Sequence, residues 1–256
     1  MPEQKQQPVV SVVMPAYNAA GFIREAVGSV LRQTMEDWEL LIVDDCSKDD
    51  SLRIAEEYAK HDSRIRVLHN EHNYGVARTR NRAIVCSCGQ YIAFLDSDDV
   101  WQPDKLKKQL ALLEAEDGDM SYCAYKIIGA DGAPVRPDYH VPQTVTYGQL
   151  LKENVICCSS MLIKKSVLED IRFNTDFFHE DYVLGLDILK AGHKAVGCRE
   201  LLVHWRYIEN SRSFNKKKSA KNRWRIYREY LKLPFFKSVY YFGHYAVAGL
   251  QKYRKR

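Results

Sequence analysis

The sequence has 256 residues, of which 46% are hydrophobic and 28% charged. This length suits one large domain or two small ones, and the composition excludes a disordered chain. No uncharged apolar run reaches the roughly 18–20 residues that span a bilayer, and the first ten residues lack the apolar core of a secretory signal. The seven cysteines lack the paired spacing of a zinc site, so we expect reduced thiols and a cytoplasmic location.

The net charge of +5 conceals an uneven distribution. Residues 211–256 contain 14 Lys/Arg and one acidic residue, so they carry +13 and leave −8 on the first 210 residues. The same tail holds 11 of the 29 aromatic residues. An acidic body with a basic tail predicts a cationic ligand in the body and an anionic partner at the tail.

The first hundred residues alternate between buried strands and amphipathic helices. Apolar runs predict strands, and fourfold apolar spacing predicts helices. The strands are expected at 9–14, 39–43, 65–68 and 91–95, and the helices at 22–31, 51–60 and 76–85. This alternation predicts an α/β fold with a mostly parallel sheet flanked by helices.

The second half is less regular. Its predicted elements are helices at 103–116 and 180–191 and strands at 120–128, 160–164 and 201–207. Asp131 and Gly132 predict a turn, and Gly192 predicts the end of a helix. We expect the basic aromatic tail to be helical.

Polar residues gather where the predicted strands end, which is where open α/β sheets bind ligands. The first strand ends in PAYN at 15–18, the second in DDCS at 44–47 and the fourth in DSDD at 96–99. Three carboxylates at one strand end repel one another, and a bound Mg²⁺ or Mn²⁺ would relieve that cost. The alternative is an acidic loop that only caps the next helix. Neither glycine-rich nucleotide fingerprint is present, which favours a metal-bridged nucleotide.

These motifs resemble those of the inverting family 2 glycosyltransferases, which have the GT-A fold, a Rossmann-like α/β architecture. The resemblance covers residues 9–110 and continues more weakly to about 213. The matching segments are VSVVMPAYN (10–18), SVLRQT (29–34), ELLIVDDCSKD (39–49), GVARTRN (75–81) and FLDSDDVW (94–101).

The resemblance implies a site for the donor, a UDP-sugar. Tyr17 would stack near the base and Asp45 would hydrogen-bond the uracil, while Asp98, with Asp96, would hold Mn²⁺ or Mg²⁺. The donor-binding residues that it implies are Pro15, Tyr17, Asn18, Asp44, Asp45, Arg80, Asp96, Ser97, Arg206 and Arg212. Two alternatives stay open, since Asp44 could cap the following loop and Arg80 could form a salt bridge with the acidic rim.

The catalytic base is expected in the sequence HEDY at 179–182. A helix N-terminus favours ionised carboxylates, and a base must start ionised. The family resemblance selects Asp181 as the base, with Glu180 positioning it or touching the acceptor. The alternative is an acidic helix N-terminus that only stabilises the helix.

Residues 205–213 resemble the loop that closes over the diphosphate in this family. Arg206 or Arg212 would neutralise the leaving group. Some family members place a histidine metal ligand here, where this sequence has Ile208. His204, nearby, is interpreted as structural.

The implied reaction moves a hexose or N-acetylhexosamine to a hydroxyl of a lipid-linked or lipopolysaccharide glycan. Residues 1–98 would bind the donor, 99–213 would carry the acceptor site and base, and 214–256 would form a basic extension on the cytoplasmic face of the inner membrane. Alternatively the tail packs on the body; no nucleic-acid motif is present. A non-catalytic nucleotide-sugar binder, or assembly partner at the membrane surface, and a nucleotidyltransferase are the competing functions.

Overall fold

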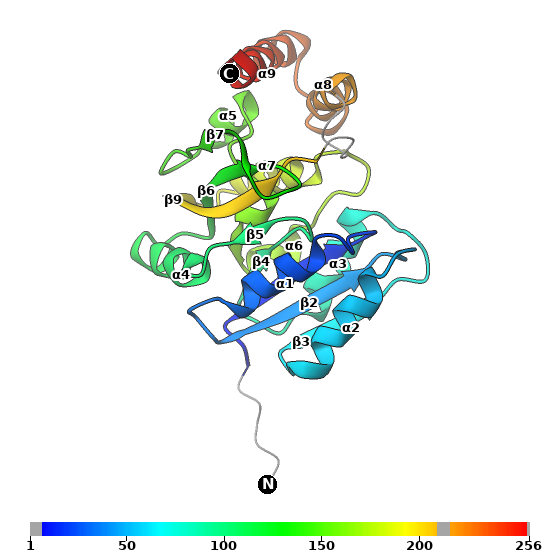
Figure 1. The fold of residues 1–256 in the computed structure, drawn as a ribbon. Coiled ribbons are helices and arrows are strands. Elements are labelled where there is room, and N and C mark those ends of the chain that lie inside the picture. The colour runs from blue at the N-terminus through cyan, green and yellow to red at the C-terminus, as the bar shows by residue number, and fades with distance from the viewer. Residues whose placement is uncertain (1–6, 209–215, 255–256) are drawn as a thin grey trace.

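The computed structural model describes residues 7–208 and 216–254 (Figure 1). Strands alternate with helices through the first half of the chain. The elements of this half are β1 (Val10–Ala16), α1 (Ile23–Leu31), β2 (Trp38–Asp44), α2 (Ser51–His61), β3 (Ile65–His69), α3 (Val76–Cys86), β4 (Tyr91–Phe94), β5 (Val100–Trp101) and α4 (Lys105–Ala115).

Longer strands and short helices make up the second half, and the chain ends in helices. The elements are β6 (Met120–Ile128), β7 (Pro134–Tyr139), α5 (Tyr147–Lys152), the 3₁₀ turn Cys158–Ser160, β8 (Leu162–Lys164), α6 (Val167–Asp170), α7 (Glu180–Lys190), β9 (Ala195–Arg206), α8 (Lys216–Arg225), the π-helical turn Ile226–Tyr230 and α9 (Phe235–Arg254).

All nine strands of the described residues belong to one sheet, in the order β3-β2-β1-β4-β8-β6-β9-β5, with β7 also paired to β6. The first four strands along the chain are parallel neighbours, and so are β6 and β9. Antiparallel pairs join β8 to β4 and β6, β5 to β9, and β7 to β6. The predicted α/β fold with a mostly parallel sheet is confirmed.

Helices cover both faces of the sheet. Along β1, Val10, Val12 and Met14 belong to one apolar cluster with α1, α2 and α4. Val13 points the other way, into a second cluster with α3, α5, α6 and α7. Because successive strand residues face opposite sides, a strand that is buried on both faces has a continuous apolar sequence.

The predicted helices and strands are present, but four short elements were missed. The missed elements are β5, β7, α5 and α6. Strand β7 is mostly exposed and contains Pro134 and Pro137, so it has no apolar pattern to recognise. Strand β9 begins at Ala195, earlier than predicted, and residues 160–161 precede β8 instead of belonging to it.

The tail is helical, as predicted, and it lies at the opposite end of the molecule from β2, α2 and β3 (Figure 1). Ile226 and Tyr227 are buried in the core beside α5 and α7. Part of the tail therefore packs on the body. No helix in the described ranges is both long and apolar enough to cross a bilayer.

Candidate active site

The carboxyl ends of the first strands bring the predicted donor-binding residues to one edge of the sheet. Ala16, before Tyr17, pairs with Asp44, and the parallel strand β4 runs into Asp96. Pro15 is buried within β1, whereas the Tyr17 side chain, 46% exposed, is open to a ligand. Ser97 is half-buried between the two aspartates of this edge.

Asp45 organises the loop that leads into α3. Its Oδ1 accepts hydrogen bonds from Asn70 Nδ2 at 2.7 Å and from the Tyr74 N–H at 2.9 Å. Its Oδ2 accepts from the N–H of Gly75 at 2.8 Å. Gly75 has φ +83°, a left-handed conformation that glycine adopts without strain. Asn70 and Tyr74 were not predicted from the sequence, because their contacts with Asp45 span 25 and 29 residues.

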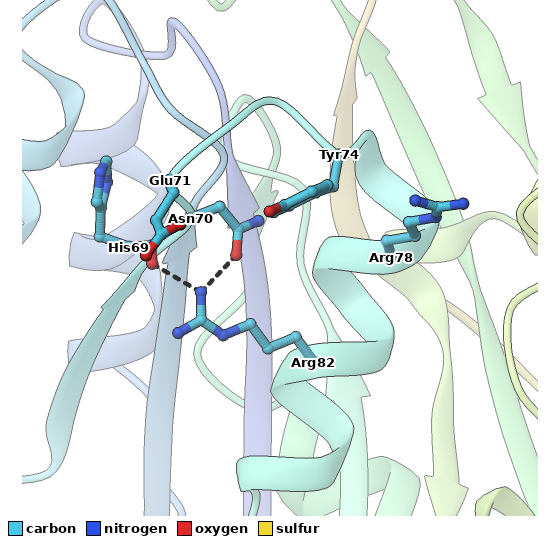
Figure 2. A pocket seen from close by; sticks show the side chains of 6 residues that line it. All are labelled: His69, Asn70, Glu71, Tyr74, Arg78 and Arg82. Carbon is cyan, nitrogen blue, oxygen red and sulfur yellow. Dashed lines mark hydrogen bonds between the residues drawn. The ribbon is translucent and has the colours of Figure 1, made fainter.

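A cavity of about 420 Å³ borders this loop (Figure 2). Its lining residues come from the end of β3, the following loop and α3, and they are His69, Asn70, Glu71, Tyr74, Arg78 and Arg82. Arg82 donates to the His69 carbonyl at 2.7 Å and to Asn70 Oδ1 at 2.5 Å, so it braces the Asn70 side chain that bonds Asp45. The sequence analysis did not predict this cavity.

Asp44 and Asn18 hold the neighbouring loop. Asp44 Oδ2 accepts from the Ser47 N–H at 3.0 Å and lies 3.2 Å from His69 Nδ1. Asn18, with φ 50°, accepts from the Lys48 N–H at 2.8 Å. The bond from Ser47 to Oδ2 is the one expected if Asp44 caps the loop that follows it, which was the alternative left open. The Oδ1 atom of Asp44 is buried with no hydrogen-bond partner among the residues described.

Arg80 joins the two carboxylate motifs. The side chain, 3% exposed, contacts Asp96 Oδ1 through Nη2 at 2.5 Å and Glu180 Oε1 through Nη1 at 2.7 Å. Burial alone would lower the pKa of Arg80, but Asp96 and Glu180 raise it well above its ordinary value. Arg80 thus forms the salt bridge with the acidic rim that was left open as an alternative. Because its second partner is Glu180, the side chain also brings the DSDD and HED motifs together, although they are about 80 residues apart in sequence.

The aspartates of the DSDD motif have different environments. Asp99 is fully buried and accepts from Ser159 Oγ at 2.5 Å and the Arg206 N–H at 2.7 Å. Burial, followed by the charge of Asp98, raises the pKa of Asp99 well above its usual range. Burial and the neighbouring Asp96 raise the pKa of Asp98 to about 6. Asp99 therefore braces the loop, while Asp96 has Oδ1 paired with Arg80.

Asp96 and Asp98 suit a metal that also takes phosphate oxygens. Among the described residues, no group of three or more His, Cys, Asp or Glu side chains is arranged to hold a metal ion. Mg²⁺ is characteristically held by one or two carboxylates together with substrate phosphates, and Mn²⁺ also prefers oxygen ligands. Carboxylates at one strand end repel one another, and a cation held between them would relieve that repulsion.

The predicted role of Arg206 in a closing loop does not agree with its place. Arg206 is the last residue of β9, and its guanidinium is buried. Nε donates to the Asp98 carbonyl at 2.7 Å, Nη1 to the Gly129 carbonyl at 3.0 Å, and Nη2 contacts Glu25 at 2.5 Å. These contacts occupy the guanidinium. Trp205 and Arg206 belong to β9, so the strand predicted at 201–207 is confirmed and the loop that the family resemblance implies does not begin at Trp205. Arg212 lies outside the described residues.

Glu180 and Asp181 open α7, as predicted. His179, just before them, has φ +66°, a left-handed conformation that is uncommon for residues other than glycine. Asp181 is half-buried, and its Oδ1 accepts from the Tyr182 N–H at 2.8 Å. Burial, followed by the Glu180 carboxylate, raises the pKa of Asp181 to about 6, while Arg80 opposes the shift. A carboxylate with this pKa is mostly ionised at neutral pH, which is the starting state that a general base needs.

The α/β architecture, with its mostly parallel sheet flanked by helices, is that of the GT-A glycosyltransferases. The model of the family "Glycosyl transferase family 2" matches residues 11–172, and the chain belongs to this family. It is a glycosyltransferase, and the nucleotidyltransferase alternative is set aside.

Two relatives and two solved structures illustrate the similarity. The Bacillus subtilis putative teichuronic acid biosynthesis glycosyltransferase TuaG is 39% identical over 96% of this chain and 98% of its own. The Escherichia coli UDP-Glc:alpha-D-GlcNAc-diphosphoundecaprenol beta-1,3-glucosyltransferase WfgD is 36% identical over 96% and 95%. S. aureus TarS 1–349 in complex with UDP-GlcNAc has a TM-score of 0.71 at 22% identity, over 86% of this chain and 64% of that one. The Pyrobaculum calidifontis mannosyltransferase PcManGT in complex with GDP-Man and Mn²⁺ has a TM-score of 0.68 at 17% identity, over 91% and 67%.

Proposed function

We propose that this glycosyltransferase moves a hexose or N-acetylhexosamine from a UDP-sugar to a glycan hydroxyl, with inversion at the anomeric carbon. The observation that carries the proposal is the Arg80 bridge, because it joins Asp96 of the donor edge to Glu180 beside the base. A donor held at the first motif would lie next to the second.

Asp181 is the proposed base. Its carboxylate removes the proton from the acceptor hydroxyl as that oxygen attacks the anomeric carbon, and the bond to the UDP oxygen breaks. Glu180 is paired to Arg80, so it orients the start of α7 and the base beside it. A single displacement of this kind produces a β-linked sugar from an α-linked donor.

The donor is assigned to residues 1–98 and the acceptor to residues 99–213. Tyr17 is assigned to stack on the base, while Asp45, with Asp44, recognises uracil at the loop that Asp45 organises. Asp96 and Asp98 would hold Mn²⁺ or Mg²⁺, which supplies positive charge against the diphosphate. The mannosyltransferase PcManGT, whose structure is in complex with GDP-Man and Mn²⁺, supports the choice of metal.

A lipid-linked glycan of a bacterial surface polysaccharide is the proposed acceptor. The names of TuaG and WfgD support this class, since one is assigned to teichuronic acid and the other acts on a diphosphoundecaprenol. Such an acceptor is held at a membrane. An enzyme placed peripherally on the cytoplasmic face of the inner membrane would meet it there.

Helix α9 is the proposed membrane contact within residues 214–256. Phe236, Tyr240 and Val247 follow one another at helical spacing and are 85%, 53% and 53% exposed. Lys237 on the same helix and Lys232 just before it are exposed as well. Exposed rings beside cations suit an anionic lipid surface, because the rings enter the headgroup region and the cations meet lipid charges.

Vesicle flotation tests the membrane contact. Anionic phosphatidylglycerol vesicles should carry the full chain upward and neutral vesicles should not, and Phe236→Ser with Tyr240→Ser should abolish flotation. Val135→Ser, at an exposed apolar residue of β7, is the matched control. Equal flotation of the double variant and the parent would remove the membrane claim.

Donor hydrolysis and transfer test the chemistry. A panel of nucleotide sugars with Mn²⁺ identifies the donor by its slow hydrolysis, and Asp181→Asn should abolish transfer while UDP affinity is retained. Asp176→Asn, at an exposed position of the preceding loop, should stay active. Full activity of Asp181→Asn would refute the base, and the absence of turnover for every donor would favour a non-catalytic binder.

A further inference from the structure

The turn before the proposed base is held by a side chain of the C-terminal helix α8. Asn222 Oδ1 accepts from the Phe178 N–H at 3.1 Å, and Asn222 Nδ2 donates to the Phe178 carbonyl. Asn222 is buried, so water does not compete for these bonds. The Asn222 amide thus bonds both the N–H and the carbonyl of Phe178, which lies three positions before Asp181.

The next residue of α8, Arg223, contacts Tyr182, the residue that follows the proposed base. The Arg223 guanidinium lies over the Tyr182 ring at 3.4 Å, and both side chains are buried. Among the described residues, Arg223 Nε and Nη1 have no hydrogen-bond partner. The rings of Tyr182 and, at 4.9 Å, of Tyr245 therefore compensate for much of the charge, and the closer contact holds Tyr182 against α8.

Between these two contacts the backbone is strained. His179 adopts φ +66°, and the helix with Glu180 and Asp181 starts directly after it. A non-glycine residue keeps such a conformation only where its surroundings impose it. Asn222 acts on the residue before His179, and Arg223 acts on the residue after Asp181, so α8 constrains the turn from both ends.

We infer that Asn222 and Arg223 are positioning residues that hold the carboxylate of Asp181 in place for proton transfer. The inference rests on the proposed role of Asp181 as base. It gives the basic C-terminal segment a part in the chemistry in addition to its proposed contact with lipid. The donor edge, built from β1, β2 and β4, makes no contact of this kind with Asn222 among the residues that the structure describes, so donor binding should not depend on it.

The test compares kcat, KM and UDP affinity in the full-length chain. Asn222→Ala should lower kcat by about 10- to 100-fold, as expected for a base displaced by about 1 Å, with the donor KM and UDP affinity unchanged. Asn222→Gln, which keeps the amide, should recover part of the loss. Lys221→Ala, at the exposed neighbouring position, should match the parent.

A second variant covers the possibility that Asn222→Ala does not fold. Arg223→Lys keeps the charge but loses the planar stack on Tyr182, and it should also lower kcat without changing UDP affinity. A kcat within about twofold of the parent for Asn222→Ala, or parallel losses of kcat and UDP affinity, would overturn the inference. Loss of folding in both variants would do the same, since it would show a purely structural role.

Asp181→Asn separates the two proposals. If that variant transfers sugar, the base assignment fails whatever Asn222 does. If Asp181→Asn is inactive and Asn222→Ala is fully active, only the positioning role fails.

Discussion

Arg80→Met would remove the charge that connects the two carboxylate motifs. Arg80 lies 2.5 Å from Asp96 and 2.7 Å from Glu180, and it is 3% exposed. Removing one partner of a buried ion pair costs about 3–5 kcal/mol, because the remaining charges are left without compensation. The Asp96 side chain is 30% exposed, so water screens part of this cost and we expect about 3 kcal/mol.

Thermal and urea unfolding measure this loss. With about 2–4 °C of Tm per kcal/mol in a domain of this size, the midpoint should fall by about 6–12 °C. Arg80→Met combined with Glu180→Gln should be more stable than Arg80→Met alone, since the second change removes a buried unpaired charge. Arg53→Met, which breaks two exposed ion pairs, with Asp50 and Glu57, should leave Tm unchanged.

The reasoning would be refuted by a loss below about 1 kcal/mol for Arg80→Met, because surface substitutions fall in that range. Equal stability of the single and double variants would also contradict it. In that case the charge of Glu180 would not be compensated by Arg80, and the contact between the two motifs would add nothing to the free energy of unfolding.

Three further predictions concern the site and the sheet. kcat should fall as the pH drops below about 6, because protonated Asp181 cannot accept a proton. Arg80→Met should move this fall to higher pH, because Arg80 lowers the pKa of Asp181. A pH-rate profile of the parent and the variant checks both. Chelation with EDTA should abolish transfer and Mn²⁺ should restore it, measured as UDP release; unchanged activity would exclude the metal. Gly89→Ala should destabilise by about 1–3 kcal/mol in urea, because a Cβ would lie 2.5 Å from the Ser11 nitrogen, whereas Gly21→Ala, with open space around it, should not.

The sequence sufficed for the features that depend on neighbours in the chain. Buried strands follow from apolar runs, the DSDD motif lies just after β4, and Glu180 and Asp181 begin α7. Gly192, predicted to end a helix, has φ +92° after α7. Such patterns are local, so a single sequence contains them.

The contacts that decide what each polar residue does could not be predicted. Arg80 and Glu180 are 100 residues apart, and Arg206 reaches Glu25 over 181. A sequence places an arginine in the chain, but the fold decides whether its donors meet carbonyls or a ligand. The family resemblance assigned Arg206 to the diphosphate, whereas its donors contact Asp98, Gly129 and Glu25.

The net charge of the basic tail likewise does not show which of its cations are free to meet a partner. Its +13 suggested a strong field toward an anionic surface, yet Arg223 is stacked inside the body on Tyr182 and Arg225 is paired with Glu229. The charges of Arg223 and Arg225 are therefore compensated by groups of the protein. The proposed attraction to lipid would then rest on the remaining exposed lysines together with the exposed rings of α9. Mutating Phe236 and Tyr240 should consequently abolish vesicle flotation even though the net charge stays the same.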